Sequence, residues 1–266
     1  MDLISKAKLQ NIAAEKGFNL IYLEKDYFLT ALLYLMKDID GLYFKGGTAL
    51  NKIVFNHTRL SEDLDFTCTT KISEAKKKIE QIVKENSNLF TGLETDKESE
   101  KFTRIQVYYK SYFREKEFIN VDLNSHAKTY LEPEKKQVKH FYKELPDFSI
   151  TMLNQKELVA EKIRALFQRN QPRDYFDAYQ IISSKQKIDE KLVRQKLKEI
   201  GLNYDIDKIF KNAKKIYSKW EQETSLTNKP ITYKTAITTI AKHFKYKEKK
   251  KKTKKTNTKK SKKSRN

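Results

Sequence analysis

Phe44-Lys-Gly-Gly-Thr-Ala-Leu-Asn-Lys52, followed shortly by Arg59-Leu-Ser-Glu-Asp-Leu-Asp-Phe66, is the stretch that decides the fold. It holds the only pair of adjacent glycines in a chain with six glycines. The pattern predicts a short strand over 42–45, a helix after the glycines and a second strand over 63–68. Because successive side chains of a strand point to opposite faces, Asp63 and Asp65 share one face of that second strand.

This order of features suits a nucleotide and a metal ion. Gly46 and Gly47 lack side chains, so phosphate groups can approach the backbone at the start of the following helix, where free N–H groups favour anions. The carboxylates of Asp63 and Asp65 are oxygen ligands that Mg²⁺ accepts together with phosphate oxygens. The stretch therefore predicts a nucleotide–metal site.

The charge of the chain points to a polyanionic partner. Its 266 residues carry 56 basic and 35 acidic side chains, a net charge of +21. Residues 245–265 hold 13 of the basic side chains and one acid, which leaves 43 basic against 34 acidic elsewhere. The body is thus basic without its Lys-rich tail, as nucleic-acid-binding proteins are. A composition inherited from an AT-rich genome explains the same charge equally well.

The expected compartment follows from features that the chain lacks. Cys68 is the single cysteine, so no internal disulfide can form and a reducing cytosol is compatible with the sequence. The N-terminal residues have neither the basic nor the apolar region of a signal peptide. No apolar run reaches about 18 residues, the length needed to span a membrane. We therefore expect a soluble, cytoplasmic protein.

Two further strands are expected over 103–109 and 118–124. The second alternates cleanly, with aliphatic residues on one face and Asn120, Asp122 and Asn124 on the other. A polar inward face suggests that this strand borders a site, which makes Asp122 a candidate third carboxylate beside the first two. An ordinary solvated strand residue gives the same periodicity.

A candidate cation lies in the helix expected over 154–168. Asn154 and Glu157 have the spacing of a capping box, which marks the start of this helix. Lys162 falls within the apolar stripe of the helix. Its ammonium group either extends along the surface to solvent or reaches into a cleft as a fixed cation for phosphate.

A group of charged residues opens the next helix. Pro172 suits its first position. Asp174 and Asp177 are three residues apart and therefore share a face, with Arg173 beside them. Acids in a first turn also complement the helix dipole, which is the ordinary explanation for them.

The pattern divides the chain into three parts. Strands and helices mix over residues 1–150, where 125–147 is interpreted as a connection before a last strand. Residues 151–244 form a helical domain, and residues 245–266 form a disordered Lys-rich tail. We expect the site in the cleft between the two domains. The other expected helices cover 3–16, 22–37, 73–84, 186–199, 205–220 and 232–244.

The combined motifs resemble those of a known family. A glycine turn, a helix, Asp-x-Asp and a later Asp on a polar strand face occur in this order in the nucleotidyltransferase superfamily related to DNA polymerase beta. The flanking residues look like the AbiEii/AbiGii family, the nucleotidyltransferase toxins of type IV toxin–antitoxin and abortive-infection systems. The motifs that carry this likeness are Lys45-Gly-Gly-Thr-Ala-Leu-x-Lys52, Arg59-x-Ser-x-Asp-Leu-Asp-Phe66, Glu157-x-x-x-Glu-Lys-x-x-Ala165 and Arg173-Asp-x-x-Asp177. The resemblance implies an α+β fold, with a nucleotidyltransferase-like mixed sheet, flanking helices and a helical C-terminal domain.

The resemblance also implies an activity and roles for particular residues. The activity is transfer of a nucleoside monophosphate from an NTP, with Mg²⁺ as cofactor and Mn²⁺ as an alternative. Family members act on tRNA ends, so the expected partners are NTP, an RNA acceptor of the tRNA class and a cognate antitoxin, with no membrane. The triphosphate would be held by Gly46, Gly47 and Thr48. Catalysis would use Asp63, Asp65, Asp122 and Lys162, the three aspartates as metal ligands. Phosphate contacts would come from Lys52, Arg59 and Lys162. The nucleotide pocket would be shaped, or Lys162 ordered, by Arg173, Asp174 and Asp177.

Two other functions are consistent with the sequence. A non-catalytic nucleic-acid-binding protein would use the basic surface and the tail, although paired carboxylates repel RNA when no metal is bound. A nucleotidyltransferase that modifies a protein or a small molecule would carry the same motifs. Transfer of label from NTPs to total tRNA separates these functions.

Overall fold

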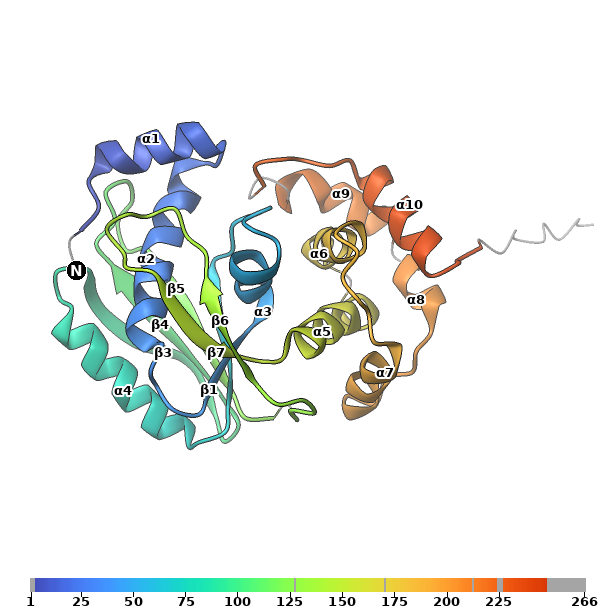
Figure 1. Cartoon of the computed structure of the whole chain (residues 1–266), viewed down its shortest axis with the longest axis horizontal. Helices are drawn as coiled ribbons and strands as arrows, with labels where there is room; N and C mark the ends of the chain where they lie inside the picture. The colour runs from blue at the N-terminus through green and yellow to red at the C-terminus, as the bar shows by residue number, and fades with distance from the viewer. Residues whose placement is uncertain (1–2, 127, 170, 212, 224–226, 248–266) are drawn as a thin grey trace, which may run out of the picture.

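The strands of the computed structural model form one mixed sheet (Figure 1). The model describes residues 3–126, 128–169, 171–211, 213–223 and 227–247. Strand β1 is antiparallel to β2 and parallel to β7, whereas β2 is parallel to β5. The order across the sheet is β3-β4-β5-β2-β1-β7-β6. The strands are β1 (Leu42–Lys45), β2 (Asp63–Cys68), β3 (Phe90–Ser99), β4 (Phe102–Tyr109), β5 (Phe118–Asn124), β6 (Glu134–Val138) and β7 (Phe148–Met152). This arrangement confirms the α+β class.

One face of the sheet is apolar and covered by helices of the N-terminal half. The helices there are α1 (Lys6–Lys16), α2 (Leu20–Met36) and α4 (Ile72–Glu85). Helix α2 packs against β2, β5 and α4, and α4 packs against β3 and β4. Leu64, Phe66 and Val121 are fully buried in this layer. The alternate residues of β2 and β5, the polar ones, therefore point to the opposite face.

The glycine turn leads from the centre of the sheet into a short, irregular helix. Helix α3 (Gly46–Ala49) continues directly as a π-helical turn, η1 (Leu50–Val54). Gly46 has φ +79°, a left-handed conformation that favours glycine. A Cβ on Gly46 would lie 1.9 Å from Asp65 Oδ2, so this position admits no side chain. The turn is thereby packed directly on the Asp65 carboxylate.

After β7 the described chain is helical. The helices are α5 (Gln155–Gln168), α6 (Pro172–Ser183), α7 (Glu190–Glu199), α8 (Ile206–Phe210), α9 (Ala213–Glu223) and α10 (Tyr233–His243). Helix α5 packs against α6 and α7, and α10 packs against α6. Figure 1 shows α5 and α6 facing α3 and the sheet. An isolated antiparallel bridge pairs Thr227, from the helical part of the chain, with Arg59.

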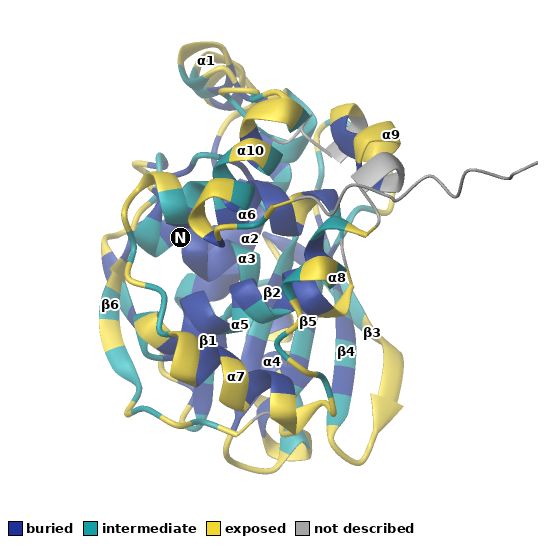
Figure 2. Ribbon diagram, turned by 90° about the vertical axis from the view of Figure 1, so that its right-hand side faces the viewer, coloured by how far each residue is buried: buried dark blue, intermediate teal, exposed yellow. Residues whose placement is uncertain are grey.

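The differences from the expected elements concern edge strands and one long helix. Strand β6 lies in the segment interpreted as a connection, and β3 was not expected. Both lie at the edges of the sheet, where charged residues replace the alternating apolar ones that mark a strand (Figure 2). The single helix expected over 205–220 is instead the pair α8 and α9. Of the predicted tail, residues 248–266 lie outside the described residues. Within the described ranges, no helix is long and apolar enough to cross a membrane.

Candidate active site

A pocket of about 260 Å³ lies between the polar face of the sheet and α5. The sheet side contributes Lys45, Gly46, Gly47, Asp65, Phe102, Asp122 and Asn124. The helix side contributes Leu158, Glu161, Lys162, Arg164, Ala165, Gln168 and Arg169. Carboxylates and glycines thus form one wall, and most of the cations form the other. The pocket lies between the sheet and the helices that follow it, the place where the sequence analysis expects the site.

Pairing of β2 with β5 brings the three predicted carboxylates together on one face. Asp65 lies beside Asp122 and Asp63 beside Asn120 in the parallel register. Asn120 Nδ2 donates a hydrogen bond of 3.0 Å to Asp63 Oδ1. Burial raises the pKa of Asp65 to about 6, and the neighbouring charges of Asp122 and Asp63 act in the same direction. A bound cation would relieve this crowding of like charges.

Asp122 is held by a residue that the sequence analysis did not single out. Arg104 lies opposite Asp122 in the β4–β5 register and donates two hydrogen bonds of 2.7 Å to its carboxylate. These hydrogen bonds raise the pKa of Arg104 above its ordinary value. The sequence could have revealed Arg104 only as a cross-strand partner of opposite charge to Asp122. Such a pair can be identified only when the register of the two strands is known.

The glycine turn is fixed by contacts on both sides. A Cβ on Gly47 would lie 2.6 Å from Arg59 Nη2, so this glycine admits the guanidinium of Arg59 close to the backbone. Thr48 is buried and its hydroxyl donates to the Asp63 carbonyl. The Thr48 hydroxyl therefore joins the turn to β2, and the contact of Thr48 with the triphosphate stays a prediction.

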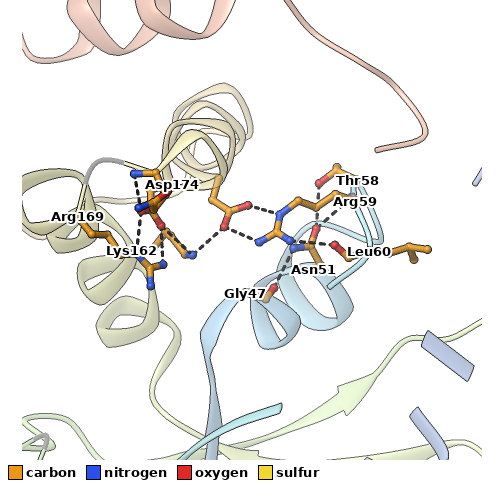
Figure 3. A network of polar contacts seen from close by, with 10 residues as sticks. Gly47, Asn51, Thr58, Arg59, Leu60, Lys162, Arg169 and Asp174 are labelled. Carbon is orange, nitrogen blue, oxygen red and sulfur yellow. Dashed lines mark hydrogen bonds and ion pairs between the residues drawn. The ribbon is translucent and has the colours of Figure 1, made fainter. Parts of the chain in front are cut away.

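A network of charged side chains connects the helices to the turn (Figure 3). Lys162 Nζ lies 2.8 Å from Asp177 Oδ2 and 3.6 Å from Asp174 Oδ1. Arg59 donates to both oxygens of Asp177, at 2.8 and 2.9 Å. Arg169 donates to both oxygens of Asp174, at 2.8 and 2.7 Å. Asp174 and Asp177 therefore order Lys162, one of the two roles that the resemblance implies.

The electrostatics of this network favour the charged forms. Burial acts to raise the pKa of Asp177, but the Arg59 and Lys162 cations outweigh it and hold this pKa well below its usual range. The pKa of Asp174 is likewise lowered, because Arg169 and Lys162 outweigh the effect of burial. Both aspartates are fully buried. They are therefore carboxylates with fixed cation partners near neutral pH.

Two of the predicted phosphate or pocket residues lie elsewhere. Lys52 is only 1% exposed, and its ammonium group contacts Asp26 at 2.8 Å and the Thr30 hydroxyl at 2.9 Å. The expectation that Lys52 contacts phosphate is wrong, because the π-helical turn directs its side chain toward α2 and not toward the pocket. Arg173 is exposed and does not line the pocket. On α6, Asp174 and Asp177 contact the pocket residue Lys162, whereas Arg173 does not line the pocket.

A second set of pocket residues was missed by sequence reasoning. Lys45 Nζ lies 4.0 Å from Glu161 Oε2, and Lys196 joins Glu161 (3.2 Å) to the fully buried Glu157 (2.6 Å). Glu157 also accepts hydrogen bonds from the backbone of Tyr130, so its carboxylate does not close the predicted capping box. Lys45 and Glu161 stand within the quoted motifs. Their proximity depends on a tertiary contact that the motifs do not specify.

The residues present fit a divalent metal in their chemistry. Asp63 and Asp65 supply carboxylate oxygens, and a hard cation such as Mg²⁺ completes its shell with water and phosphate oxygens. In the part of the chain that the structure describes, no group of three or more His, Cys, Asp or Glu is arranged to hold a metal ion. Asp122, the third predicted ligand, is engaged by Arg104.

Comparisons with known proteins agree with this fold and identify a family. Among curated protein sequences, none matches the chain. The structure of MenT4, a nucleotidyltransferase toxin from Mycobacterium tuberculosis, is similar with a TM-score of 0.60 and 21% identity over 75% of this chain and 71% of that one. A putative nucleotidyltransferase from Helicobacter pylori is similar with a TM-score of 0.58 and 19% identity, covering 86% and 97% of the chains. JHP933 from Helicobacter pylori has a TM-score of 0.57 and 19% identity, covering 86% and 94%. The model of the family "Nucleotidyl transferase AbiEii toxin, Type IV TA system" matches residues 27–254, and the chain therefore belongs to this family of nucleotidyltransferase toxins.

Proposed function

We propose that the protein transfers a nucleoside monophosphate from an NTP to an RNA acceptor of the tRNA class, in a metal-dependent reaction that arrests growth. The observation that carries the proposal is the pairing of the two walls of the pocket. Asp65 and Asp122 line one wall, and Lys162 and Arg169 line the other. Such a pocket can hold a metal-bound triphosphate between carboxylates and cations.

Each wall has a distinct task in this proposal. The backbone of Gly46 and Gly47 approaches the triphosphate, because neither residue has a side chain. Lys162, whose orientation Asp174 and Asp177 fix, stabilises charge that develops on the phosphates. Asp63, Asp65 and Asp122 would hold Mg²⁺ or Mn²⁺. Bound there, the metal would promote attack by the acceptor hydroxyl and stabilise the pyrophosphate leaving group.

The acceptor and the biological setting are parts of the same proposal. A net charge of +21 supports docking of a polyanion such as RNA. An RNA acceptor of the tRNA class places the protein in the cytoplasm and makes translation the affected process. Membership in a type IV toxin family supports a cognate antitoxin as partner. The structural similarity to MenT4, a nucleotidyltransferase toxin, is consistent with this role.

The test is transfer of radiolabel from each of the four NTPs to total tRNA in the presence of Mg²⁺. We expect label to enter the tRNA fraction from at least one NTP. Asp65→Asn should reduce the rate by about 10³-fold, because it removes a metal ligand while keeping the shape of the side chain. Asp63→Ala should likewise abolish both transfer and growth inhibition.

The controls separate the proposal from its alternatives. Label in a protein or small-molecule fraction alone would replace the RNA acceptor. Absence of transfer to any acceptor, with tight RNA binding retained, would favour a protein that only binds nucleic acid. Thermal unfolding of Asp65→Asn at the wild-type temperature or above confirms that the variant folds, since a neutral side chain relieves the repulsion from Asp63 and Asp122.

A further inference from the structure

The four cations of the pocket differ in their partners. Lys162 contacts Asp177 and Asp174, and Arg169 donates to Asp174. Lys45 lies 4.0 Å from Glu161. Arg164 also lines the pocket, yet it forms no hydrogen bond or ion pair with any residue that the structure describes. Arg164 is thus the pocket cation without a fixed counterion.

The Arg164 side chain is also incompletely satisfied. Its Nε is buried and has no hydrogen-bond partner among the described residues. Buried donors of folded proteins are almost always paired, and an exception at a functional site often marks the place of a ligand. The nearest acid on its own helix face, Glu161, is already engaged by Lys196 at 3.2 Å and by Lys45. Arg164 therefore brings a positive charge to the pocket, but no described residue accepts a hydrogen bond from its Nε.

The position of Arg164 on α5 directs it into the pocket. Glu161, Arg164, Ala165 and Gln168 are spaced by three, four and seven residues, which places them on one face of a helix. All four line the pocket. Burial acts to raise the pKa of Glu161, but the charges of Lys45, Lys196 and Arg164 outweigh it and lower this pKa, so Arg164 is close enough to act on a pocket carboxylate.

We propose that Arg164 binds a phosphate group of the substrate in this pocket. The inference rests on the proposed function, in which both substrates, NTP and RNA, carry phosphates. A guanidinium presents planar donors that match two phosphate oxygens, and the buried Nε lies on the edge of that fork. Lys162 and Arg169 on the same wall likewise favour an anionic ligand on this side of the pocket. The bound phosphate belongs either to the triphosphate or to the RNA backbone.

The experiment compares two phosphate ligands on the full-length protein. Inorganic tripolyphosphate with Mg²⁺ is the probe for the triphosphate, and a single-stranded RNA oligonucleotide is the probe for the acceptor. Binding of each is measured by calorimetry for the wild type, Arg164→Gln, Arg164→Lys and Arg194→Gln. Arg194 is the matched control, because it is an exposed arginine on α7 that pairs with Glu190 and stacks on Tyr204.

We expect Arg164→Gln to weaken the binding of one of the two probes about tenfold, with Arg164→Lys intermediate. Loss confined to tripolyphosphate assigns Arg164 to the NTP, and loss confined to RNA assigns it to the acceptor. Unchanged binding of both probes would overturn the inference, as would an equal loss in Arg194→Gln. Thermal unfolding shows whether Arg164→Gln folds; if it does not, the Arg164→Lys comparison alone decides, since that variant keeps the charge and loses the fork.

The inference and the proposed function fail in different ways. If the wild type transfers label to RNA but Arg164→Gln binds both probes normally, only the assignment of Arg164 fails. If the wild type transfers no label but binds tripolyphosphate through Arg164, the phosphate site stands and the proposed reaction fails.

Discussion

Two buried lysines of this protein, Lys52 and Lys162, both pair with aspartates, but Lys52 lies in the core and Lys162 lines the pocket. Lys52 lies in what we call the core cluster, with Asp26, Thr30 and Tyr142, whose hydroxyl donates to Asp26 at 2.8 Å. Lys162 lies in the cleft cluster, with Arg59, Arg169, Asp174 and Asp177. The core cluster pairs one cation with one carboxylate. The cleft cluster sets three cations against two carboxylates.

The difference in charge balance is the one expected between a structural cluster and a cluster that binds an anion. The core cluster is neutral and sealed, so burial of its charges is compensated within the protein. The cleft cluster retains one excess positive charge beside the pocket, which suits an anionic ligand. Redundant partners also mean that each carboxylate of the cleft cluster keeps a cation when one is removed. Asp26, in contrast, forms an ion pair with no cation other than Lys52 among the described residues.

The largest effect is expected when the cleft cluster loses its pocket-facing lysine. Lys162→Gln should lower the rate of nucleotide transfer by about 10²–10³-fold, because a fixed charge at the phosphates is lost. Its effect on stability should be small, since Asp177 keeps Arg59 and Asp174 keeps Arg169. Transfer kinetics and thermal unfolding of the same preparation measure both. If Lys162→Gln lost much of its stability but kept the wild-type transfer rate, the cleft cluster would support stability and not catalysis, and the contrast with the core cluster would be wrong.

Disruption of the core cluster should lower the stability of the protein and leave the rate of nucleotide transfer nearly unchanged. Lys52→Met leaves Asp26 buried without a cation and should cost about 3–5 kcal/mol of unfolding free energy. The double variant Asp26→Leu/Lys52→Met should recover most of this loss, because neither charge then remains. Denaturant unfolding measures the stability, and the folded double variant should transfer nucleotide within about threefold of wild type. Loss of transfer in a stable double variant would restore a phosphate role to Lys52.

A smaller effect is expected from His57, which lies beside the core cluster. Burial lowers the pKa of His57 to about 4, and the Lys52 charge adds to this, whereas Asp26 and the hydrogen bond with the Lys139 carbonyl oppose it; His140 lowers it slightly further. The folded state therefore binds fewer protons than the unfolded one. The stabilisation is complete above pH 6.5 and is lost as the pH falls toward 4, by about 2 kcal/mol between pH 7.5 and 5.

Replacement of His57 isolates this contribution. Asparagine tolerates the left-handed φ of +61° at this position, so His57→Asn keeps the backbone conformation. Unfolding free energies of both proteins at pH 7.5 and 5 should show a smaller fall in the variant. An equal fall in both proteins would mean that His57 does not titrate in this range.

The smallest effect is expected at Arg173. This residue stands beside Asp174 in the sequence motif, but it is exposed and absent from the pocket wall. Arg173→Gln should change kcat and KM for NTP less than about twofold, because exposed charges interact weakly with the site. Steady-state kinetics at two salt concentrations provide the measurement. A rise of more than about twofold in KM for the RNA acceptor, with KM for NTP unchanged, would mean that Arg173 contributes to RNA binding.

The placement of the carboxylates was predictable because it depends on local alternation. Asp63, Asp65 and Asp122 share a face whenever β2 and β5 are strands of one sheet, and the parallel register then sets Asp65 beside Asp122. The glycine turn was equally local, since Gly46 needs both a positive φ and the absence of a Cβ. These features require only the backbone periods of the sequence.

The partners of the charged residues were not predictable in the same way. Lys52 and Lys162 both stand in family-like motifs, yet the π-helical turn after α3 rotates Lys52 into the core. Arg104 meets Asp122 through a strand register, and Lys45 meets Glu161 through a contact between sheet and helix. Motifs specify residue types, whereas tertiary packing specifies which opposite charges meet.

The bidentate contact between Arg59 and Asp177 joins residues that are 118 positions apart. A ribosome adds about 5–20 residues per second, so roughly 6–24 s separate the synthesis of the two partners. Asp63 and Asp65 follow Arg59 within six residues, whereas Lys162 and the aspartates that orient it come more than 100 residues after Arg59. A growing chain therefore cannot form the Arg59–Asp177 contact, which ties the glycine turn to the helices, until α6 has been synthesised.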